Sequence, residues 1–418
     1  MTTFQTLRPN DALLPVEEAQ RRVLAEVTPL DAEEVALMDA HGRVLREDIR
    51  APFDVPAADN TAMDGYAVRS EDIANAPVSL RVIEDLPAGR VAQQRVEPGT
   101  AIRIMTGALL PDGADCVANV EITDAGSEVV RVLQPLRRGA NVRRRAEDMA
   151  AGDVVLASGT VIGAGEIGVL AGVQKTRVLV ARKPTVAILS TGDEIVDVGE
   201  ERGAGKVVNS NAYALAALVR ECGGEPRMHG IVRDTREATV AAIERALDCD
   251  FVISSGGVSV GAYDFVKAAL DELGAETKFW RIAMKPGKPV VLSTLRGRIY
   301  FGLPGNPVSC MVSFLLFVAP SLRKAMGQTA GILPPIVRAR VAAPMRSNGE
   351  RRTYHRVRVV AEHGELVAQP MRAQGSGVST SMVQANGLAI LESGVTSVDA
   401  GAIVDVVLFG PVRSGEER

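Results

Sequence analysis

Two lysines, Lys285 and Lys288, lie three positions apart in the segment Lys-Pro-Gly-Lys-Pro at 285–289. Lysine is scarce in this chain, since it accounts for only eight of the 47 lysine and arginine residues. Because the two prolines stiffen the backbone, both ammonium groups would be presented from one loop as compact point charges. The segment is therefore a candidate anion-binding loop, and a solvated surface turn is the alternative.

A second loop has the composition of a phosphate-binding loop. The segment Ser254-Ser255-Gly256-Gly257-Val258-Ser259 directly follows an apolar β-type run. Two glycines let backbone N–H groups approach a phosphate closely, serines add hydroxyl donors, and a following helix would offer its positive end. The alternative is that the two glycines only permit a tight turn.

Carboxylates occur on neighbouring loops, at Asp193, Glu194, Asp234 and Asp264. Carboxylates beside a phosphate site commonly hold Mg²⁺ or accept hydrogen bonds from a base or sugar. Each one taken singly could instead be a helix N-cap, and Asp234 is the strongest candidate for that role. As metal ligands, the sequence favours Asp234 and Asp264.

The histidines and cysteines form no pattern typical of a metal or disulfide site. The four cysteines are scattered singly without C-x-x-C, which predicts reduced thiols in a cytosolic protein. The four histidines include no H-E-x-x-H and no pair at ligand spacing. Any metal that takes part is therefore expected to be held by oxygen atoms, which favours Mg²⁺.

These loops need a scaffold that brings them together. From residue 184 onward, apolar strand-like runs alternate with helical runs, which predicts a doubly wound parallel α/β sheet. Helices are expected over 212–222 with Asn211 as N-cap, from an Asp234-x-x-Glu237 capping box to 247, over 264–273 and over 307–326. Each candidate loop follows a strand, and ligands of open α/β sheets bind outside the carboxyl ends of the strands. One crevice is predicted.

The rest of the chain is expected to form three further parts around this α/β domain at 184–330. Residues 1–50 and 147–183 are typical of an elongated helical and β N-terminal unit, in which Val16, Ala19 and Val23 share one helix face. Short β-type runs separated by turns predict an inserted β-rich domain at 51–146. Residues 331–418 predict an all-β, barrel-like C-terminal domain.

Composition and charge exclude several classes of protein. At 418 residues with 46% hydrophobic and 23% charged residues, the chain is typical of a multidomain globular protein. The net charge of −4 gives no basic footprint for nucleic acid. The N-terminus lacks the pattern of a signal peptide, and the apolar run at 308–320 is too short to span a bilayer, so a buried helix is expected there.

Taken together, the motifs resemble the molybdopterin molybdenumtransferase family, the MoeA-type enzymes that are also related to the C-terminal domain of gephyrin. The similar segments occur in the family's order over nearly the whole chain: PFDVPAADNTAMDGYAV, RIMTGA, NVRRRAED, STGDE, SSGGVSVGAYD, AMKPGKP, GLPGNPVS, YHRV and GSGVSTSMVQANGL. The resemblance implies four domains, a molybdopterin-binding α/β domain and a cytoplasmic homodimer whose inserted domain faces the partner's crevice. It also implies the reaction, in which molybdate enters the dithiolene of adenylylated molybdopterin and AMP is released with Mg²⁺ present.

The resemblance also implies roles for individual residues. Lys285 matches the essential lysine of the family, Asp64 matches the aspartate of its M-D-G motif, and Thr106 and Asp148 match further positions associated with activity. The substrate-binding set that it implies is Thr191, Glu194, Ser255, Gly256, Gly257, Ser259, Asp264, Arg281, Pro304 and Pro307. The molybdate set is Lys285, Lys288, Arg351, Ser376 and Ser381.

Three positions depart from the family's pattern. Thr61 stands where serine is frequent, which keeps the hydroxyl, and Arg281 stands where lysine is frequent, which keeps the charge. Ala146 replaces a glycine before Glu147-Asp148, which puts the local turn and the direction of Asp148 in question.

Two other functions compete with molybdenum insertion. The chain could adenylylate molybdopterin, as a related group of single-domain proteins does, although the extra residues on both sides of the α/β domain argue against it. It could instead be a non-catalytic scaffold of the gephyrin kind. The partners expected from the resemblance are molybdoenzymes or other proteins of cofactor biosynthesis, with no nucleic acid and no membrane.

Overall fold

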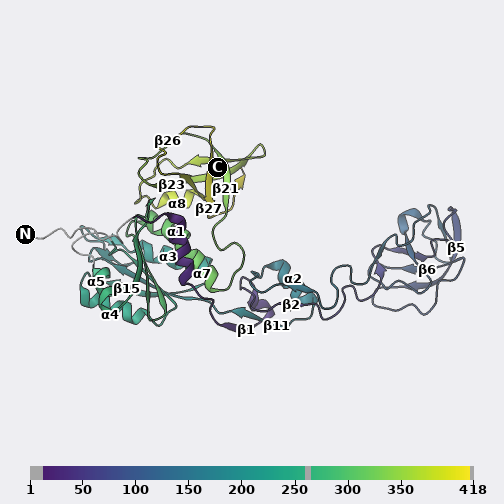
Figure 1. Ribbon diagram of the computed structural model, residues 1–418. Helices are drawn as coiled ribbons and strands as arrows, with labels where there is room; N and C mark the ends of the chain where they lie inside the picture. Colours follow the sequence, from purple (N-terminus) through teal and green to yellow (C-terminus); the bar gives the residue numbers. More distant parts are fainter. Residues whose placement is uncertain (1–12, 259–264, 415–418) are drawn as a thin grey trace, which may run out of the picture. The chain divides into compact units, whose positions relative to one another are not determined.

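The computed structural model describes residues 13–258 and 265–414 (Figure 1). The chain divides into two compact units. Unit 1 comprises residues 1–46, 159–163 and 177–418, and unit 2 comprises residues 47–158 and 164–176. Each unit is described by itself below.

A six-stranded sheet forms the centre of unit 1, in the order β15-β12-β16-β20-β19-β17. The first four strands are parallel, whereas β19 and β17 run antiparallel at one end, so the sheet is mixed rather than wholly parallel. The strands are β12 (Thr185–Thr191), β15 (Glu225–Val232), β16 (Phe251–Ser255), β17 (Glu276–Arg281), β19 (Pro289–Leu295) and β20 (Arg298–Leu303). The short pair β13 (Ile195–Val196) and β14 (Val207–Val208) lies between β12 and the next helix.

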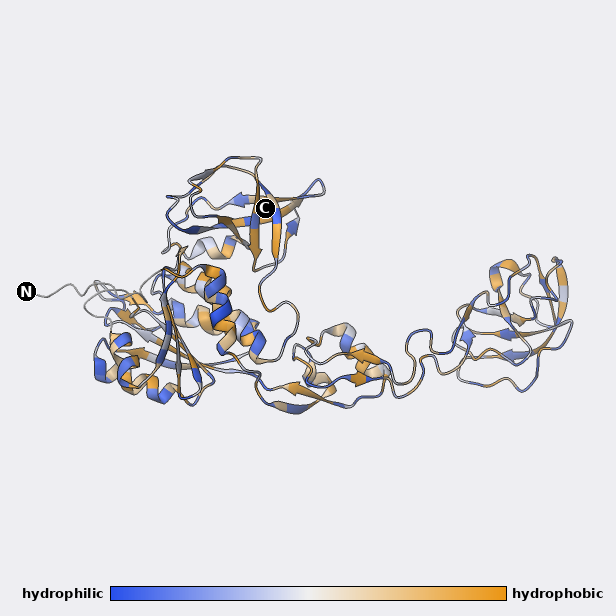
Figure 2. Ribbon diagram, viewed as in Figure 1, coloured by the Kyte–Doolittle hydropathy of each residue, from blue (hydrophilic) through white to orange (hydrophobic). Residues whose placement is uncertain are grey.

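Helices cover both faces of this sheet because its strands are apolar on both sides. In β12, Val186 and Ile188 join one core, and Ala187 and Leu189 join another. The first core includes α1, α3, α6 and α7, and the second includes α4 and α5. The helices are α1 (Val16–Glu26), α3 (Ser210–Glu221), α4 (Arg236–Ala246), α5 (Phe265–Glu272), α6 (Pro307–Ser313) and α7 (Ala319–Ala325). Their mixed colouring in Figure 2 is that of helices with one apolar face. The predicted doubly wound architecture is confirmed.

The continuous helical stretch Pro307–Ala325 includes a π-helical turn, η4 (Phe314–Val318). Among the described residues it is the one helix long and apolar enough to cross a membrane, but 78% of its most apolar window is buried inside the protein. Its hydropathy is that of a core helix, as predicted from the sequence. Pro307 occupies its first turn, and Asn306 is the N-cap.

Two predicted helix caps are wrong. The N-cap of α3 is Asn209 rather than Asn211, and its side chain accepts a hydrogen bond from Ser190 instead of capping the helix. The N-cap of α4 is Thr235, whose hydroxyl accepts from the backbone N–H of Ala238. Asn, Asp and Thr all favour the position, so tertiary contacts decide which of two neighbouring residues takes it.

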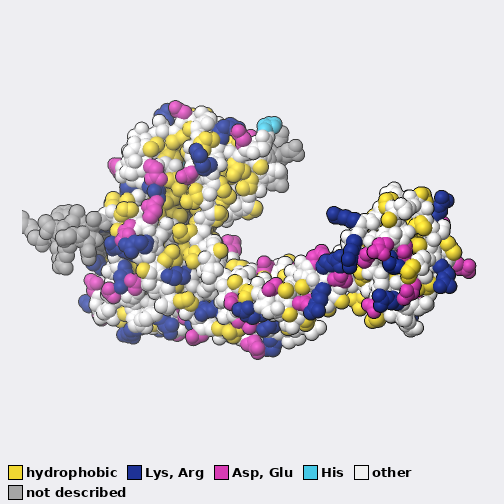
Figure 3. Space-filling model, turned by 45° about the vertical axis from the view of Figure 1, so that its right-hand side comes forward, with side chains coloured by type: hydrophobic (Ala, Val, Ile, Leu, Met, Phe, Trp, Pro, Cys, Tyr) yellow, Lys and Arg dark blue, Asp and Glu magenta, His cyan; other side chains and the backbone are white. Residues whose placement is uncertain are grey.

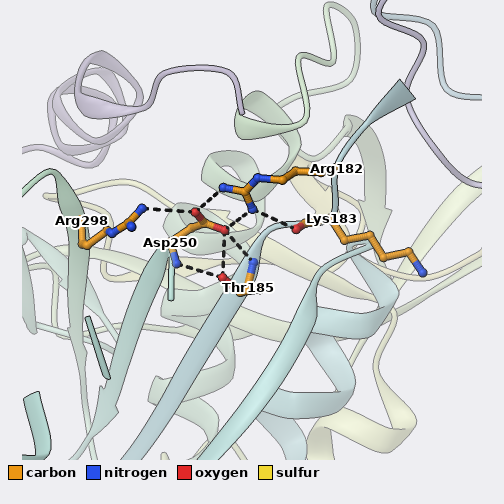
Figure 4. Close-up of polar contacts among 5 residues, drawn as sticks. All are labelled: Arg182, Lys183, Thr185, Asp250 and Arg298. Atoms are coloured by element: carbon orange, nitrogen blue, oxygen red, sulfur yellow. Dashed lines mark hydrogen bonds and ion pairs between the residues drawn. The ribbon is translucent and has the colours of Figure 1, made fainter. Parts of the chain in front are cut away.

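A buried carboxylate fixes the start of the sheet (Figure 4). Asp250, just before β16, accepts two hydrogen bonds from the Arg182 guanidinium at 2.6 and 2.7 Å and two from the backbone N–H and hydroxyl of Thr185 at 2.9 Å. Arg298 adds an ion pair at 3.4 Å. Because Arg182 follows β11 (Arg177–Ala181), which pairs with β1 (Ala32–Ala36), the carboxylate ties that two-stranded ribbon to the sheet.

The C-terminal part of unit 1 is a closed β-barrel, as the sequence predicted. Its strands form a ring β23-β24-β21-β27-β25 that closes by pairing β25 with β23. They are β21 (Ile336–Val341), β23 (Arg352–Glu362), β24 (Glu365–Pro370), β25 (Gly387–Leu391) and β27 (Ile403–Leu408), with the helix α8 (Thr380–Gln384). The short strands β22 (Met345–Arg346) and β26 (Ser397–Val398) pair with each other, while β28 (Arg413–Ser414) and β18 (Met284–Lys285) pair with β23.

Unit 2 contains a five-stranded sheet in the order β7-β4-β6-β5-β8. Its strands are β4 (Gly65–Val68), β5 (Val78–Leu86), β6 (Thr100–Ile104), β7 (Cys116–Asn119) and β8 (Val129–Val132). Two further pairs are β3 (Asn60–Thr61) with β9 (Val142–Arg143) and β2 (Ile49–Arg50) with β10 (Val154–Leu156). The helix α2 (Ala164–Gly172) completes the unit, and the 3-10 turns are η2 (Leu37–Ala40) in unit 1 and η3 (Val120–Ile122) in unit 2. The four-domain division remains a prediction.

Candidate active site

A cavity of about 570 Å³ opens in unit 1 where the loops after several sheet strands meet. Eight sequence-predicted residues line it: Thr191, Glu194, Asp234, Ser255, Gly256, Gly257, Pro304 and Pro307. They lie at the carboxyl ends of β12, β15, β16 and β20 or just after them, as the rule for ligand sites of open α/β sheets requires. The cavity is therefore the crevice expected from the sequence.

Gly256 and Gly257 occupy backbone conformations that other residues rarely adopt, with φ of +95° and +63°. A Cβ atom at Gly256 would lie 2.7 Å from the Thr191 carbonyl oxygen, and one at Gly257 would lie 2.8 Å from the Thr191 hydroxyl. The loop consequently packs backbone directly against Thr191. The Thr191 hydroxyl is buried and has no hydrogen-bond partner among the described residues, which leaves it available to a ligand in the cavity.

Asn211 joins two of these loops, a role that the cap prediction missed. Its side-chain amide donates to the Ser255 hydroxyl and to the Gly305 carbonyl oxygen, both at 2.8 Å. Because Ser255 accepts this bond, its own hydrogen remains a donor. The signal available in the sequence was an asparagine just inside a helix that begins at the carboxyl end of the sheet.

The acidic residues gather on one side of the cavity. Glu194 and Asp234 line it, and Asp193 accepts from the backbone N–H of Asp234 at 3.2 Å. Burial raises the pKa of Asp234, and the negative charges of Asp193 and Glu194 raise it further. A carboxylate with such neighbours gains from a cation beside it.

Three cationic side chains lie in the segment 281–288, and a fourth lies just before β23. They are Arg281, Lys285, Lys288 and Arg351. Lys285 pairs with Thr353 in the β18–β23 ladder, and Arg351 donates to the carbonyl oxygen of Met284 at 3.2 Å. Within residues 13–258 and 265–414, none of the four forms an ion pair with a carboxylate, so their charge is available to an anion.

The barrel contributes a loop that contains Ser376. The Ser376 carbonyl oxygen accepts from the backbone N–H of Val308, next to the cavity residue Pro307, at 3.0 Å. Ser381 is buried, and its hydroxyl donates to the Val378 carbonyl oxygen at 2.6 Å. The Ser381 hydroxyl therefore stabilises the loop that contains it. Ser376 is half-buried.

Arg356 is a residue that sequence reasoning missed. It is 1% exposed, and its guanidinium donates to the carbonyl oxygens of Ala373 and Gly375 and to the Ser381 hydroxyl, each at 3.1 Å. Burial lowers its pKa. No carboxylate among the described residues pairs with it, so it holds the Ser376 loop and leaves a buried positive charge beside it.

Unit 2 brings together two of its three predicted catalytic residues. The Asp64 carboxylate accepts from the hydroxyl of Thr106 at 2.6 Å and from its backbone N–H at 2.7 Å. These two bonds lower the pKa of Asp64, so the exposed carboxylate is ionised over a wide pH range. A Cβ atom at Gly65 would lie 2.1 Å from the Ala118 carbonyl oxygen, which explains the glycine after Asp64.

Asp148 lies in a separate turn of unit 2 whose shape depends on Ala146. Ala146 has a φ of +60°, the left-handed conformation that glycine adopts without cost. The backbone N–H groups of Ala146 and Asp148 donate to the carbonyl oxygens of Pro56 and Val55 at 3.0 Å. The alanine thus keeps the turn of a glycine at an energetic cost. Thr61 is buried, and its hydroxyl donates to the Met63 carbonyl oxygen just before Asp64.

Two predicted substrate residues, Ser259 and Asp264, lie outside the described residues. For Asp264 this applies to its proposed metal role as well.

Three family models match the chain in succession. The "MoeA N-terminal region (domain I and II)" matches residues 14–173, the "Probable molybdopterin binding domain" matches 187–324, and the "MoeA C-terminal region (domain IV)" matches 338–409. All residues that line the cavity lie within the second of these spans.

Relatives of known name match nearly the full length. Curated proteins named molybdopterin molybdenumtransferase from Nostoc sp. and Bacillus subtilis are 39% and 36% identical, and the Nostoc match covers 97% of this chain and 96% of the relative. Among solved structures, a molybdopterin biosynthesis MoeA protein from Pyrococcus horikoshii OT3 superposes with a TM-score of 0.83 at 31% identity, covering 95% of this chain and 100% of that one.

Proposed function

Since this chain belongs to the MoeA family, whose curated relatives are molybdopterin molybdenumtransferases, we propose that it inserts molybdate into adenylylated molybdopterin and releases AMP. One observation carries the assignment of the site. A cavity built from the Gly256-Gly257 loop is accompanied, in the same unit, by four cations that pair with no carboxylate among the residues that the structure describes. A site for a phosphorylated pterin and an oxyanion needs both parts.

The glycine loop binds the phosphates of the substrate. Backbone N–H groups at Gly256 and Gly257 approach without side chains in the way, and the free Thr191 hydroxyl and the Ser255 hydrogen add donors. Asn211 holds the loops after β16 and β20 together, so these donors are oriented before the substrate arrives.

Molybdate is a tetrahedral dianion, and Lys285, Lys288 and Arg351 attract it. Ser376 supplies a hydroxyl from the barrel loop that Arg356 holds. The same cations offset the charge that develops as the phosphoanhydride is cleaved, and such preorganised electrostatics is usually the largest catalytic contribution.

The acidic side of the cavity fits Mg²⁺. Carboxylate oxygens are the ligands that Mg²⁺ prefers, and the raised pKa of Asp234 beside Asp193 and Glu194 marks a place where a cation relieves repulsion. Asp234 would hold the ion, with Glu194 as a further ligand. When bound, Mg²⁺ would supply charge neutralisation at the substrate phosphates.

Asp64 acts as a hydrogen-bond acceptor or base. Its lowered pKa keeps it ionised at neutral pH, so it orients water or accepts a proton and does not donate one. Thr106 fixes the direction of the carboxylate.

The test is Lys285→Ala in the purified protein, with molybdenum incorporation and AMP release as readouts. We expect kcat to fall by about 10²–10³, the range for loss of one charge-stabilising donor. Lys267→Ala is the matched control, because Lys267, on α5, lies over the ring of Trp280 in β17 and does not line the cavity. Unchanged molybdenum insertion by a folded Lys285→Ala variant would contradict the catalytic role of Lys285.

The active form is a homodimer whose site is shared between subunits. The resemblance to the family supports this proposal. The division of the candidate residues is compatible with it, since Asp64, Thr106 and Asp148 belong to unit 2 and the cavity belongs to unit 1. Mixing Lys285→Ala and Asp64→Asn proteins under conditions of subunit exchange should restore about a quarter to a half of the activity. If mixtures stay as inactive as each variant alone, the shared site is wrong.

The protein acts in the cytoplasm, without nucleic acid or membrane, and passes its product to molybdoenzymes or other proteins of cofactor biosynthesis. On the face shown in Figure 3, acidic and basic side chains are interspersed, so that face has no extended basic surface of the kind that binds nucleic acid.

A further inference from the structure

Three different metal-ligating side chains meet at the edge of the central sheet, and none of them lines the cavity described above. They are His229 on β15 and Asp248 and Cys249 in the turn between α4 and β16. One donor atom from each, an imidazole nitrogen, a carboxylate oxygen and a thiol sulfur, lies within 4.8 Å of the other two. The sequence showed no sign of this because the histidine is far from the other two residues.

We propose that His229, Asp248 and Cys249 form a binding site for a borderline divalent cation, Zn²⁺ or its analogue Co²⁺. Imidazole and thiolate are ligands that zinc and cobalt favour and that Mg²⁺ does not. Three protein ligands leave one position of a tetrahedral ion to water. Tetrahedral bonds of about 2.0–2.3 Å require donor separations somewhat shorter than 4.8 Å, so modest side-chain rotation closes the site around the ion.

A β-bulge directs His229. β12 and β15 pair Ile188 with Met228 but Ser190 with Ile231, so one extra residue of β15 is accommodated at His229–Gly230. Gly230 has a φ of +82°, the conformation that such an irregularity requires. Bulges on edge strands re-aim side chains next to functional sites, and β15 is an edge strand.

The donors have few competing partners. The half-buried His229 ring has no hydrogen bond or ion pair within the described part of the chain. Asp248 is exposed and has one competing cation, Arg227, at 3.5 Å. The buried Cys249 has a pKa raised to about 11 by burial and by Asp248, so its thiol is protonated at neutral pH. On binding, the S–H proton passes to solvent and the sulfur–metal bond forms in its place.

The site differs from the one proposed for Mg²⁺. Asp248 and Cys249 precede β16, whereas Ser255 ends it and the glycine loop follows, so these two ligands lie at the opposite end of that strand from the cavity. A bound ion would tie β15, which leads directly to Asp234, to the α4–β16 turn.

Titration of tag-free, metal-stripped protein with Co²⁺ tests the proposal. We expect one equivalent to bind with a near-ultraviolet thiolate-to-cobalt charge-transfer band and a raised thermal midpoint. Excess Mg²⁺ should leave the band unchanged. Absence of the band in the wild-type protein would overturn the proposal.

Matched variants locate the ligands. Cys249→Ser should abolish the band, and the more exposed His229→Gln should weaken Co²⁺ binding at least about tenfold while leaving Trp280 fluorescence native. Arg227→Gln should tighten binding about threefold to fivefold, because it removes the competing cation from Asp248. Cys222→Ser, which changes another thiol, should behave as the wild type. A band that survives both Cys249→Ser and His229→Gln would assign the metal to another site.

Discussion

At the scale of single residues, the direction of Asp64 depends on one neighbouring side chain. Thr106 donates two hydrogen bonds to the same carboxylate oxygen, one from its hydroxyl and one from its backbone. The side-chain bond is the larger cause of the lowered pKa of Asp64. Thr106 therefore sets both where Asp64 points and the pH range over which it is ionised.

Replacement of Thr106 by valine should lower kcat by several-fold to about tenfold, because the carboxylate keeps only the backbone donor. With the hydroxyl bond lost, the pKa of Asp64 rises toward its ordinary value. Protonation of Asp64 then begins at a higher pH, so the acid limb of the kcat profile should move upward in pH. Measurement of kcat against pH for Thr106→Val checks both effects. Thr106→Ser keeps the hydroxyl and should retain the wild-type profile, and equal losses in both variants would contradict this role.

Ala146 offers a stability test in unit 2. Its φ of +60° costs alanine roughly 1–2 kcal/mol and costs glycine little. We expect Ala146→Gly to stabilise unit 2 by about 1 kcal/mol, net of the extra chain entropy of glycine. Calorimetry should show a higher unfolding midpoint. Ala74→Gly, at an exposed alanine without positive φ, should lower the midpoint instead, and a parallel fall in both variants would show that Ala146 is unstrained.

At the scale of elements, the cavity depends on how loops are joined to one another. Asn211 lies in the first turn of α3 and donates to the loops after β16 and β20. The loops themselves have little regular structure, so these bonds determine their separation. Helix α3 thus holds the two loops in place through Asn211, and the loops carry the groups that donate hydrogen bonds to a ligand.

Asn211→Ala should raise KM for the adenylylated pterin about fivefold to 150-fold, since two hydrogen bonds worth roughly 0.5–1.5 kcal/mol each are lost. Helix content should stay unchanged, because Asn209 rather than Asn211 is the N-cap of α3. Circular dichroism together with steady-state kinetics separates the two effects. Loss of helix content with an unchanged KM would instead support the role of Asn211 as the N-cap of α3, which the sequence predicted.

The two cap corrections show what sequence reasoning can and cannot reach at this scale. Apolar periodicity predicted the strands and helices around the cavity, because burial on both faces of the sheet leaves a strong pattern. It could not decide between Asn209 and Asn211 or between Asp234 and Thr235, because neighbouring residues have similar intrinsic preferences for the cap. Partners far along the chain, such as Ser255 and Gly305 for Asn211, made the choice.

At the scale of the whole molecule, the sequence predicted the doubly wound α/β sheet and the barrel-like C-terminal part, and both are confirmed, whereas the four-domain division stays a prediction. The cluster of His229, Asp248 and Cys249 and the buried Arg356 escaped prediction for one physical reason. Their partners are brought close only by strand register and loop packing. The roles of individual residues in the reaction remain predictions that the variants above can test.

The Asp250 anchor governs the stability of the α/β part of unit 1. Burial alone would raise the pKa of Asp250, but its hydrogen bonds from Arg182 and Thr185 outweigh burial and lower it. Because the folded pKa lies below the unfolded one, the stabilisation is fully present above the unfolded pKa of about 3.9 and is lost as pH falls through the folded value.

Asp250→Asn should therefore lower the free energy of unfolding by about 2–3 kcal/mol near pH 7, since it leaves the Arg182 guanidinium without its charged partner. The difference in the free energy of unfolding between the variant and the wild type should become smaller as the pH falls below about 4. Trp280, the single tryptophan, lies in β17 of the central sheet, so its fluorescence during denaturant unfolding reports on this part. Asp271→Asn, on the exposed surface of α5, is the control. If this difference in the free energy of unfolding did not depend on pH, the charge of Asp250 would not be the cause of the stabilisation.

The chain enters and leaves the five-stranded part of unit 2 at one place. Val55 and Met149 form an antiparallel bridge, and β2 pairs with β10 just beyond it. Residues so paired lie about 5 Å apart, a distance that a two-residue hairpin closes. The intervening 56–148 could therefore be excised and replaced by a short turn without moving the flanking strands. The pairing is that of a segment inserted into a hairpin of a continuous fold, and Asp64 and Thr106 both belong to the inserted segment.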